Sequence, residues 1–219
     1  MVLTRAQAKR FYDRFGSKQD SQSFYEDQAL DELIAHADFA HAHSLFELGC
    51  GTGRFALRLL SSQLPADATY VGMDLSDTMI ALAQQRLASY ANRADVVHSE
   101  GNMQFPLGDQ SVDRVVATYV FDLLADTDIE QTIREARRVL SPGGKLCLVS
   151  LSQGVNFASH LVCRLWSGLF RLHAPLVGGC RPIRLSPFFK PAQWSVDYHH
   201  VLTQFGVPSE VLIATPAPE

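Results

Sequence analysis

The sequence predicts an α/β fold, a doubly wound sheet with helices on both faces and ligands at the carboxyl ends of its central strands. Two observations support this prediction. Between residues 44 and 151, short apolar runs alternate with segments of helical periodicity, as strands and crossover helices do. At residues 45–55, an apolar run leads into three alternating glycines and then into a helical pattern, which indicates a strand, a tight turn and a helix start.

Length and composition limit the classes of protein that the chain can belong to. Its 219 residues are 47% hydrophobic, which suits a single globular domain with its own core. The net charge of −4 and the lack of a basic run argue against a nucleic-acid partner. Cys50, Cys147, Cys163 and Cys180 show no metal-ligand spacing, so we expect reduced thiols, no metal and a cytoplasmic protein. We identify no signal peptide and no run as long as a membrane span.

The first 43 residues are predicted to form helices that precede the sheet. Between residues 4 and 37, apolar side chains recur at helical intervals, with Phe11, Tyr12 and Phe15 on one face. Gly16 and Ser17 interrupt the pattern, so we expect two helices.

The elements that follow are taken in chain order. We expect a strand at 44–48, a helix at 55–64, a strand at 69–74, a helix at 76–91, strands at 95–98 and 111–118, a helix at 128–140 and a strand at 146–151. Beyond these we expect a helix-length segment at 154–173, a short helix at 187–193, and two strands at 194–205 and 209–215, antiparallel to each other.

Asp74 ends the second predicted strand and is a candidate ligand-binding residue. It lies about 20 residues after the glycine turn, the offset at which a carboxylate accepts hydrogen bonds from ribose hydroxyls. The alternative is that it caps the next helix. Because Ser76 or Asp77 can supply that cap, Asp74 is free to bind a ligand.

The glycine turn also indicates a family. Its sequence at residues 45–55 is LFELGCGTGRF, with Arg54 where a dinucleotide fingerprint has its third glycine. Glu47 and the three glycines resemble motif I of the class I S-adenosylmethionine-dependent methyltransferases, and RVLSPGG at 138–144 resembles a later turn of that family. The resemblance covers about residues 44–150. It implies a Rossmann-like, seven-stranded sheet with an antiparallel final strand, S-adenosylmethionine as cofactor, and transfer of its methyl group.

The resemblance also implies which residues contact the cofactor. They are Tyr12, Glu47, Gly49, Cys50, Gly51, Thr52, Gly53, Asp74, Leu75, Met79, Asn102, Met103, Thr118 and Tyr119. At Asn102 the family usually has an acidic residue that accepts a bond from the adenine amino group, and an amide oxygen accepts the same bond. For Met79, plain core packing is the alternative.

The resemblance divides the chain into regions. In many similar enzymes a helix with a Tyr-Asp pair, here Tyr12-Asp13, folds over the cofactor, although simple packing of Tyr12 is an alternative. We therefore expect an N-terminal helical lid at 1–43 and a methyltransferase domain at 44–219, whose helical insertion at about 154–183 covers the substrate.

The acceptor is the least determined part of the prediction. Asp122 follows the fourth strand, where similar enzymes often have a polar side chain, and is the candidate base; an ordinary loop aspartate is the alternative. The apolar excess at 154–173 lines a pocket, rests on a membrane surface or belongs to the core. We expect a small lipophilic or aromatic acceptor, quinone-like or lipid. A non-catalytic S-adenosylmethionine-binding module remains open, as does a nucleic-acid or protein methyltransferase.

Overall fold

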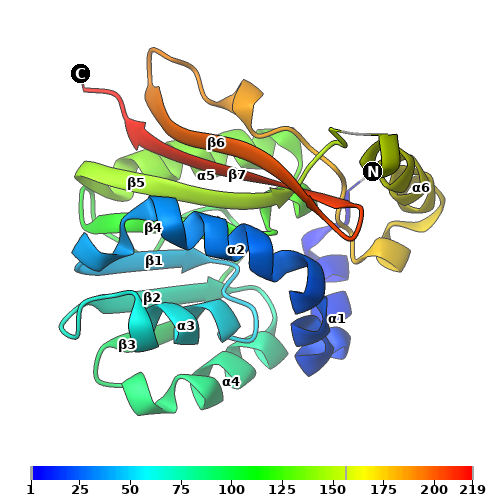
Figure 1. The fold of residues 1–219 in the computed structure, drawn as a ribbon. Helices are drawn as coiled ribbons and strands as arrows, with labels where there is room; N and C mark the ends of the chain where they lie inside the picture. The colour runs from blue at the N-terminus through cyan, green and yellow to red at the C-terminus, as the bar shows by residue number, and fades with distance from the viewer. Residues whose placement is uncertain (1, 156, 219) are drawn as a thin grey trace.

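Seven strands form one mixed sheet in the order β3-β2-β1-β4-β5-β7-β6 (Figure 1). The computed structural model describes residues 2–155 and 157–218. The strands are β1 (Ser44–Leu48), β2 (Thr69–Asp74), β3 (Ala94–His98), β4 (Val112–Thr118), β5 (Leu140–Leu151), β6 (Trp194–Gln204) and β7 (Val207–Pro216). The first five pair in parallel, and β7 is antiparallel to both β5 and β6. The predicted Rossmann-like, doubly wound sheet is confirmed.

Six α-helices accompany the sheet in the described residues. They are α1 (Arg5–Phe15), α2 (Ser23–Ala37), α3 (Arg54–Ser62), α4 (Asp77–Arg86), α5 (Asp126–Val139) and α6 (Phe157–His173). Short 3₁₀ segments include η1 (Gly16–Gln22), η4 (Phe121–Leu123), η5 (Ala174–Val177) and η6 (Ser186–Phe188). The helix predicted at 187–193 is only the single turn η6, because Pro191 disfavours a helical conformation at the residue before it. No helix in the described part of the chain is long and apolar enough to cross a membrane.

The core lies on both faces of the sheet. In β5, Cys147 and Val149 face α2 and α3, whereas Leu146 and Leu148 face α5, and all four are at most 1% exposed. This alternation follows from the two-residue period of a strand. A central parallel strand covered by helices on both sides is apolar throughout, as the sequence of β5 is.

The carboxyl ends of the parallel strands are covered by α1 and α6, at the right of Figure 1. This is the edge at which open α/β sheets bind ligands. Within the predicted lid at 1–43, only α1 and η1 lie over this edge. The helix α2 packs against β5 and β7 instead, where Leu30 and Leu33 join the core.

A buried arginine joins α2 to the sheet. Arg114 in β4 is 5% exposed, and its guanidinium donates to the carbonyls of Ala37 at 2.8 Å, Asp38 at 2.7 Å and Asp113 at 2.9 Å. Because Ala37 and Asp38 end α2, the positive charge meets carbonyls that have no partner within the helix and the negative end of its dipole.

We predict that Arg114→Ala lowers the free energy of unfolding by about 3 kcal/mol, because it removes three charge-assisted hydrogen bonds and leaves buried carbonyls without donors. Urea unfolding measures the change. The control is Arg134→Ala, whose side chain is 69% exposed and only 4.0 Å from Glu130, and which should change stability by less than about 0.5 kcal/mol. Equal midpoints for the two variants would contradict the structural role of Arg114.

Candidate functional site

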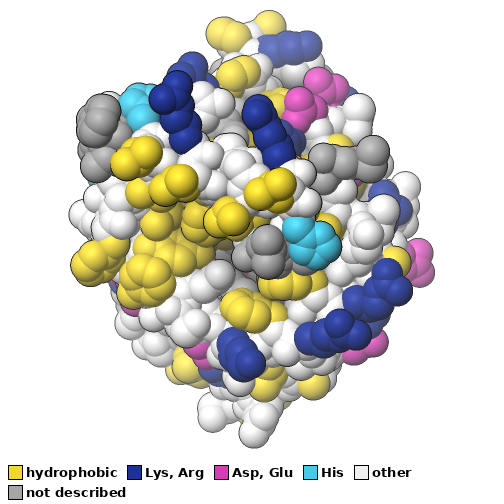
Figure 2. Space-filling view, turned by 90° about the vertical axis from the view of Figure 1, so that its right-hand side faces the viewer, with side chains coloured by type: hydrophobic (Ala, Val, Ile, Leu, Met, Phe, Trp, Pro, Cys, Tyr) yellow, Lys and Arg dark blue, Asp and Glu magenta, His cyan; other side chains and the backbone are white. Residues whose placement is uncertain are grey.

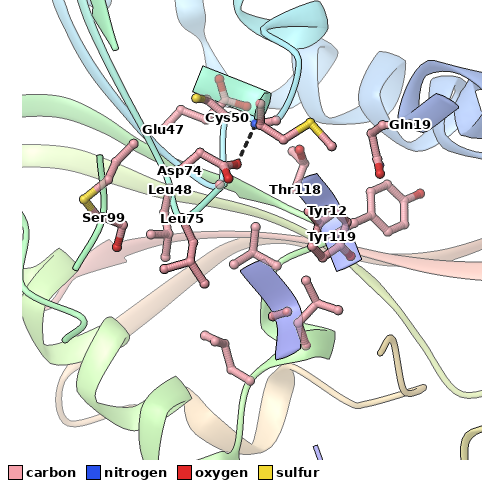
Figure 3. Close-up of a pocket in the computed structure, with 18 of the residues that line it drawn as sticks. Tyr12, Gln19, Glu47, Leu48, Cys50, Asp74, Leu75, Ser99, Thr118 and Tyr119 are labelled. Atoms are coloured by element: carbon pink, nitrogen blue, oxygen red, sulfur yellow. Dashed lines mark hydrogen bonds between the residues drawn. The ribbon is translucent and has the colours of Figure 1, made fainter. Parts of the chain in front are cut away.

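The turn between β1 and α3 is held against the end of β2 by hydrogen bonds. The N–H groups of Gly49 and Cys50 donate to the carbonyl of Met73, at 2.7 and 3.2 Å. The N–H of Gly51 donates to Oδ2 of Asp74 at 2.9 Å, the dashed line in Figure 3. Because protein groups accept all three bonds, the turn keeps its shape without a ligand.

The glycines of this turn have positive φ angles, and at two of them a side chain would collide with a neighbouring residue. At Gly49, where φ is 70°, a Cβ would lie 2.4 Å from Cγ2 of Val120. At Gly51, where φ is 53°, no heavy atom of the described residues beyond its chain neighbours lies within 4 Å of the Cβ position. A ligand can therefore approach the backbone at Gly51 closely. Gly53 serves packing, since its Cβ would lie 3.0 Å from Cα of Ala83 in α4.

Asp74, the last residue of β2, has both carboxylate oxygens fixed. Oδ2 accepts from Gly51, and Oδ1 accepts from the N–H of Ser76 at 2.9 Å. Oγ of Ser76 caps α4 by accepting from the N–H of Met79, in agreement with the predicted cap. Burial raises the pKa of Asp74 by more than these hydrogen bonds lower it. Each fixed oxygen keeps a lone pair that can accept a further donor.

Glu47 in β1 supplies a second carboxyl group. It is 1% exposed, and its Oε2 accepts a hydrogen bond of 2.7 Å from the hydroxyl of Tyr70. Burial, with a smaller contribution from the charge of Asp74, raises the pKa of Glu47 to about 8, although the hydrogen bond from Tyr70 lowers it. A cation bound beside the two carboxyl groups would favour their ionised forms.

These groups line a cavity of about 220 Å³ at the carboxyl ends of β1, β2 and β4, beneath α1 (Figure 3). Most of the residues predicted to contact a cofactor line it. They are Tyr12, Glu47, Gly49, Cys50, Gly51, Thr52, Asp74, Leu75, Met79, Met103, Thr118 and Tyr119. Met103 and Tyr119 have φ values of 56°, an uncommon conformation for residues other than glycine that tends to cluster at functional sites.

Two residues of that prediction lie outside the lining. Gly53 faces α4, as described above. Asn102 is turned to its own loop, where Oδ1 accepts from the N–H of Gln104 at 3.1 Å and its carbonyl accepts from Nε2 of Gln131 at 3.0 Å. An asparagine often bonds the backbone two residues ahead in this way, a local competition that sequence spacing does not reveal. From this loop, Ser99 contributes to the lining instead.

The helix α1 is fastened over the cavity by contacts with the start of α4. Asp13 accepts from Oγ of Ser76 at 2.6 Å and from the N–H of Thr78 at 3.3 Å. Lys9 lies 2.6 Å from the carboxylate of Asp77. The N–H of Thr78 is one of the donors that a helix start leaves without a partner within the helix. The three contacts hold α1 and the start of α4 together.

The segment η1 also borders the cavity, which Gln19 and Asp20 line, and together with α1 it forms the cover of the cavity. Asp20 accepts from the guanidinium of Arg86 at 2.6 Å and from Oγ1 of Thr52 at 2.6 Å, which joins it to both α4 and the glycine turn. Tyr12 lines the cavity with its ring, while its hydroxyl donates to the carbonyl of Gly178 at 3.3 Å. The cover is thus linked at its other side to the loop that follows α6.

A second, smaller cavity adjoins the first. Its volume is about 10 Å³, roughly the room that one water needs. Tyr12, Gln19 and Tyr119 line both cavities. The other residues that line the smaller one are Gln22, Tyr25, Asp122, Leu151, Trp166 and Cys180.

The candidate base Asp122 belongs to this smaller cavity. Its side chain is fully buried, and Oδ1 accepts from Oγ of Ser150 at 3.3 Å. Oδ2 has no hydrogen-bond partner of ordinary geometry among the described residues. Burial raises the pKa of Asp122 to about 6, although the Cys180 thiol, Ser150 and Arg181 favour the ionised form. Asp122 is therefore a buried carboxyl group whose pKa of about 6 leaves it ionised at neutral pH and whose Oδ2 can accept a further hydrogen bond.

Several lining residues were not selected from the sequence. Ala8 and Arg5 line the larger cavity one turn and two turns before Tyr12, and their helical spacing from it is a signal that could have identified them. Cys180 had no such signal. Its neighbour Arg181 pairs with Asp126 at 2.6 Å.

Comparisons with known proteins identify sequences and structures to which this chain is similar. A family model described as a methyltransferase domain matches residues 45–144. The chain is 32% identical over 166 residues to a malonyl-[acyl-carrier protein] O-methyltransferase of Marinomonas sp., covering 75% of this chain and 57% of the relative. It is 34% identical over 148 residues to a demethylmenaquinone methyltransferase of Lactiplantibacillus plantarum, covering 67% and 60%. The chain thus spans little more than half the length of these relatives.

Among solved structures, the fold is similar to that of a complex between the Haloferax volcanii Trm112 methyltransferase activator and a methyltransferase described there as putative. The TM-score is 0.74 at 14% identity, with 97% of this chain and 98% of the other covered. At that identity the match concerns the fold alone. The family model, the curated relatives and the matching glycine turn together identify the family, whose members use S-adenosylmethionine as methyl donor. The chain belongs to the class I S-adenosylmethionine-dependent methyltransferases.

Proposed function

We propose that this protein binds S-adenosylmethionine in the larger cavity and transfers its methyl group to a small lipophilic or aromatic acceptor that enters beside Asp122. The observation that carries the proposal is a pair of carboxyl groups, buried Glu47 and half-buried Asp74, on either side of a glycine turn with an open backbone position at Gly51. The ligand has complementary parts, namely an amino-acid end, a charged sulfonium and an adenosine.

The residues present fit that ligand. Asp74 accepts hydrogen bonds from the ribose hydroxyls with the lone pairs that its own contacts leave free. Glu47 attracts the positive amino group. Leu75 and Met79 border the adenine, and the backbone at Gly51 allows close approach. Bound there, S-adenosylmethionine supplies a methyl group on a sulfonium, a good leaving group, so the main task of the protein is to align the acceptor.

Asp122 is proposed as the base. An acceptor hydroxyl that donates to Oδ2 would satisfy the buried oxygen that has no partner in the described structure. Asp122 would take the proton of that hydroxyl as the acceptor oxygen receives the methyl group, which the bound sulfonium would supply while leaving as a neutral thioether. A pKa of about 6 keeps Asp122 ionised at neutral pH and close enough to it for general-base catalysis.

Aromatic side chains around Asp122 support a lipophilic or aromatic acceptor. The rings of Tyr25 and Tyr119 meet edge to face at 5.9 Å, and Trp166 closes the cavity from α6. Such walls favour an apolar ring over a polar nucleotide, whose groups would lose water without gaining partners. Of the two relatives reported above, the one named for demethylmenaquinone fits this environment better.

A non-catalytic binding module is the second candidate, and one observation favours it. The smaller cavity, at about 10 Å³, has no room for an acceptor. Methyl transfer therefore requires movement of the side chains or elements that enclose Asp122, among them Tyr12 on α1 and Trp166 on α6. A binding module would need no such movement.

We predict that S-adenosylmethionine and S-adenosylhomocysteine bind in titration calorimetry and that NAD does not. Asp74→Ala should weaken both at least about tenfold, since it removes the acceptor for two ribose hydroxyls and the anchor of Gly51. Asp67→Ala, whose side chain is 76% exposed, is the control and should bind like the wild type. If folded Asp74→Ala keeps wild-type affinity, the ribose assignment is wrong.

We predict that Asp122→Asn lowers kcat at least about a hundredfold toward a hydroxylated quinone or phenol, with S-adenosylhomocysteine affinity nearly unchanged. Wild-type kcat/KM should fall as the pH drops below about 6, because protonated Asp122 cannot accept the proton. The readout is release of S-adenosylhomocysteine, with Asp67→Asn as the control. Equal activity of Asp122→Asn across this pH range would exclude the base, and absence of release with every acceptor would favour the binding module.

A further inference from the structure

The outer side of α6 exposes a stripe of leucines. Leu161, Leu165, Leu169 and Leu172 are 53%, 63%, 45% and 81% exposed. At about 100° per residue, they fall within an arc of about 80° on the helix. The inner side of the same helix is packed, with Cys163 buried against the protein. The helix α6 therefore has apolar side chains on its packed side and also a regular apolar stripe that faces outward.

Basic side chains border this stripe along one side. His160, Arg164 and Arg171 are exposed and fall in the arc next to the leucines. The chain has 23 acidic residues, yet none lies between residues 136 and 196. That stretch carries eight of the 19 Lys and Arg residues of a chain whose net charge is −4. The charge distribution therefore separates a basic region, which contains α6, from an acidic remainder.

A second apolar group adjoins α6 at the turn between β6 and β7. Phe205 is 76% exposed and lies with its ring 5.9 Å from that of Phe24, which is 56% exposed. The next residue in the turn, Gly206, lies against Val162 of α6, since a Cβ there would be 3.1 Å from Cγ2 of that valine. Figure 2 shows the side of the molecule on which α6 lies, with hydrophobic side chains gathered there and Lys and Arg side chains beside them.

We propose that the outer stripe of α6, together with Phe24 and Phe205, is a docking surface for an anionic lipid membrane. Leucines and phenylalanines enter the boundary between headgroups and acyl chains, while Arg164 and Arg171 keep their charges at the level of the anionic headgroups. A surface that combines exposed leucines and phenylalanines with two exposed arginines matches such a membrane in both polarity and charge.

The proposed docking surface lies beside the elements that enclose the smaller cavity. Trp166 on α6 lines that cavity, and its Nε1 donates to the carbonyl of Cys180 at 3.0 Å. Tyr25, which also lines it, meets the ring of Phe24 at 5.1 Å. Docking thus places the elements that enclose Asp122 at the lipid surface. The docking proposal itself stands without the proposed methyl transfer.

The test is co-sedimentation with vesicles of phosphatidylcholine, alone or with 30% phosphatidylglycerol. We expect the wild type to bind the anionic vesicles and to dissociate as NaCl is raised from 0.05 to 0.5 M. Leu165→Ser/Leu172→Ser should reduce this binding at least about tenfold, and Arg164→Gln/Arg171→Gln should abolish the preference for anionic vesicles. The control, Val196→Ser/Arg134→Gln, alters an exposed valine of β6 and an exposed arginine of α5 and should bind like the wild type.

Far-ultraviolet circular dichroism and S-adenosylhomocysteine binding establish that each variant is folded, because the four substituted residues of α6 line neither cavity. Absence of wild-type binding to anionic vesicles would overturn the proposal, as would unchanged binding in both α6 variants. So would a wild-type dimer in light scattering that Leu165→Ser/Leu172→Ser dissociates, since a second copy of the chain would then cover the leucines.

Discussion

The hydrogen bond from the Gly51 N–H to Asp74 joins the two strand ends on which the site depends. It fixes the turn after β1 to the last residue of β2, and the bonds from Gly49 and Cys50 to Met73 reinforce it. The same carboxylate positions Ser76, which starts α4, and α4 in turn holds α1 over the cavity through Asp13. The cover, the glycine turn and the carboxylate therefore form one connected set of polar contacts.

The site keeps acidic groups where burial opposes their ionisation. Burial raises the pKa of Glu47 to about 8 and that of Asp122 to about 6, and it raises the pKa of Asp74 as well. Because folded Glu47 holds a proton that the unfolded chain loses above its ordinary pKa of 4.5, its contribution to stability falls as the pH rises from about 4.5 to about 8. Perturbed carboxyl groups that converge on a cavity are typical of functional sites. A positively charged group bound beside Glu47 would favour its ionised form and so lower its pKa.

The fold could be predicted from sequence where local signals and packing agree. The strand boundaries at Ser44–Leu48 and Thr69–Asp74 are as predicted, because apolar runs there end at a glycine turn and at a carboxylate. The placement of Glu47 and Asp74 in one cavity follows from that topology. Asn102 does not line the cavity, against the prediction, because its side-chain oxygen accepts a hydrogen bond from its own loop. Sequence spacing does not reveal that such a local bond competes with ligand binding.

The sequence does not reveal which residues that are far apart along the chain lie close together in space. Cys180 and Asp122 line one small cavity although 58 positions separate them, and no local pattern predicts that contact. The sequence of the apolar segment at 154–173 does not distinguish a pocket wall, a lipid-facing surface and core, whereas in α6 different residues have different surroundings. Trp166 lines the smaller cavity, Cys163 is buried and Leu172 faces outward.

The central claim is that the ligand places its positively charged amino group beside the buried carboxyl group of Glu47 in β1 and its ribose beside Asp74 at the end of β2. The most direct measurement is the number of protons released when S-adenosylhomocysteine binds at pH 7, obtained by calorimetry in buffers of different ionisation enthalpy. Since the pKa of Glu47 is about 8, the account predicts that the wild type releases nearly one proton more than Glu47→Gln and binds more tightly. Equal proton release and equal affinity for the two proteins would contradict it.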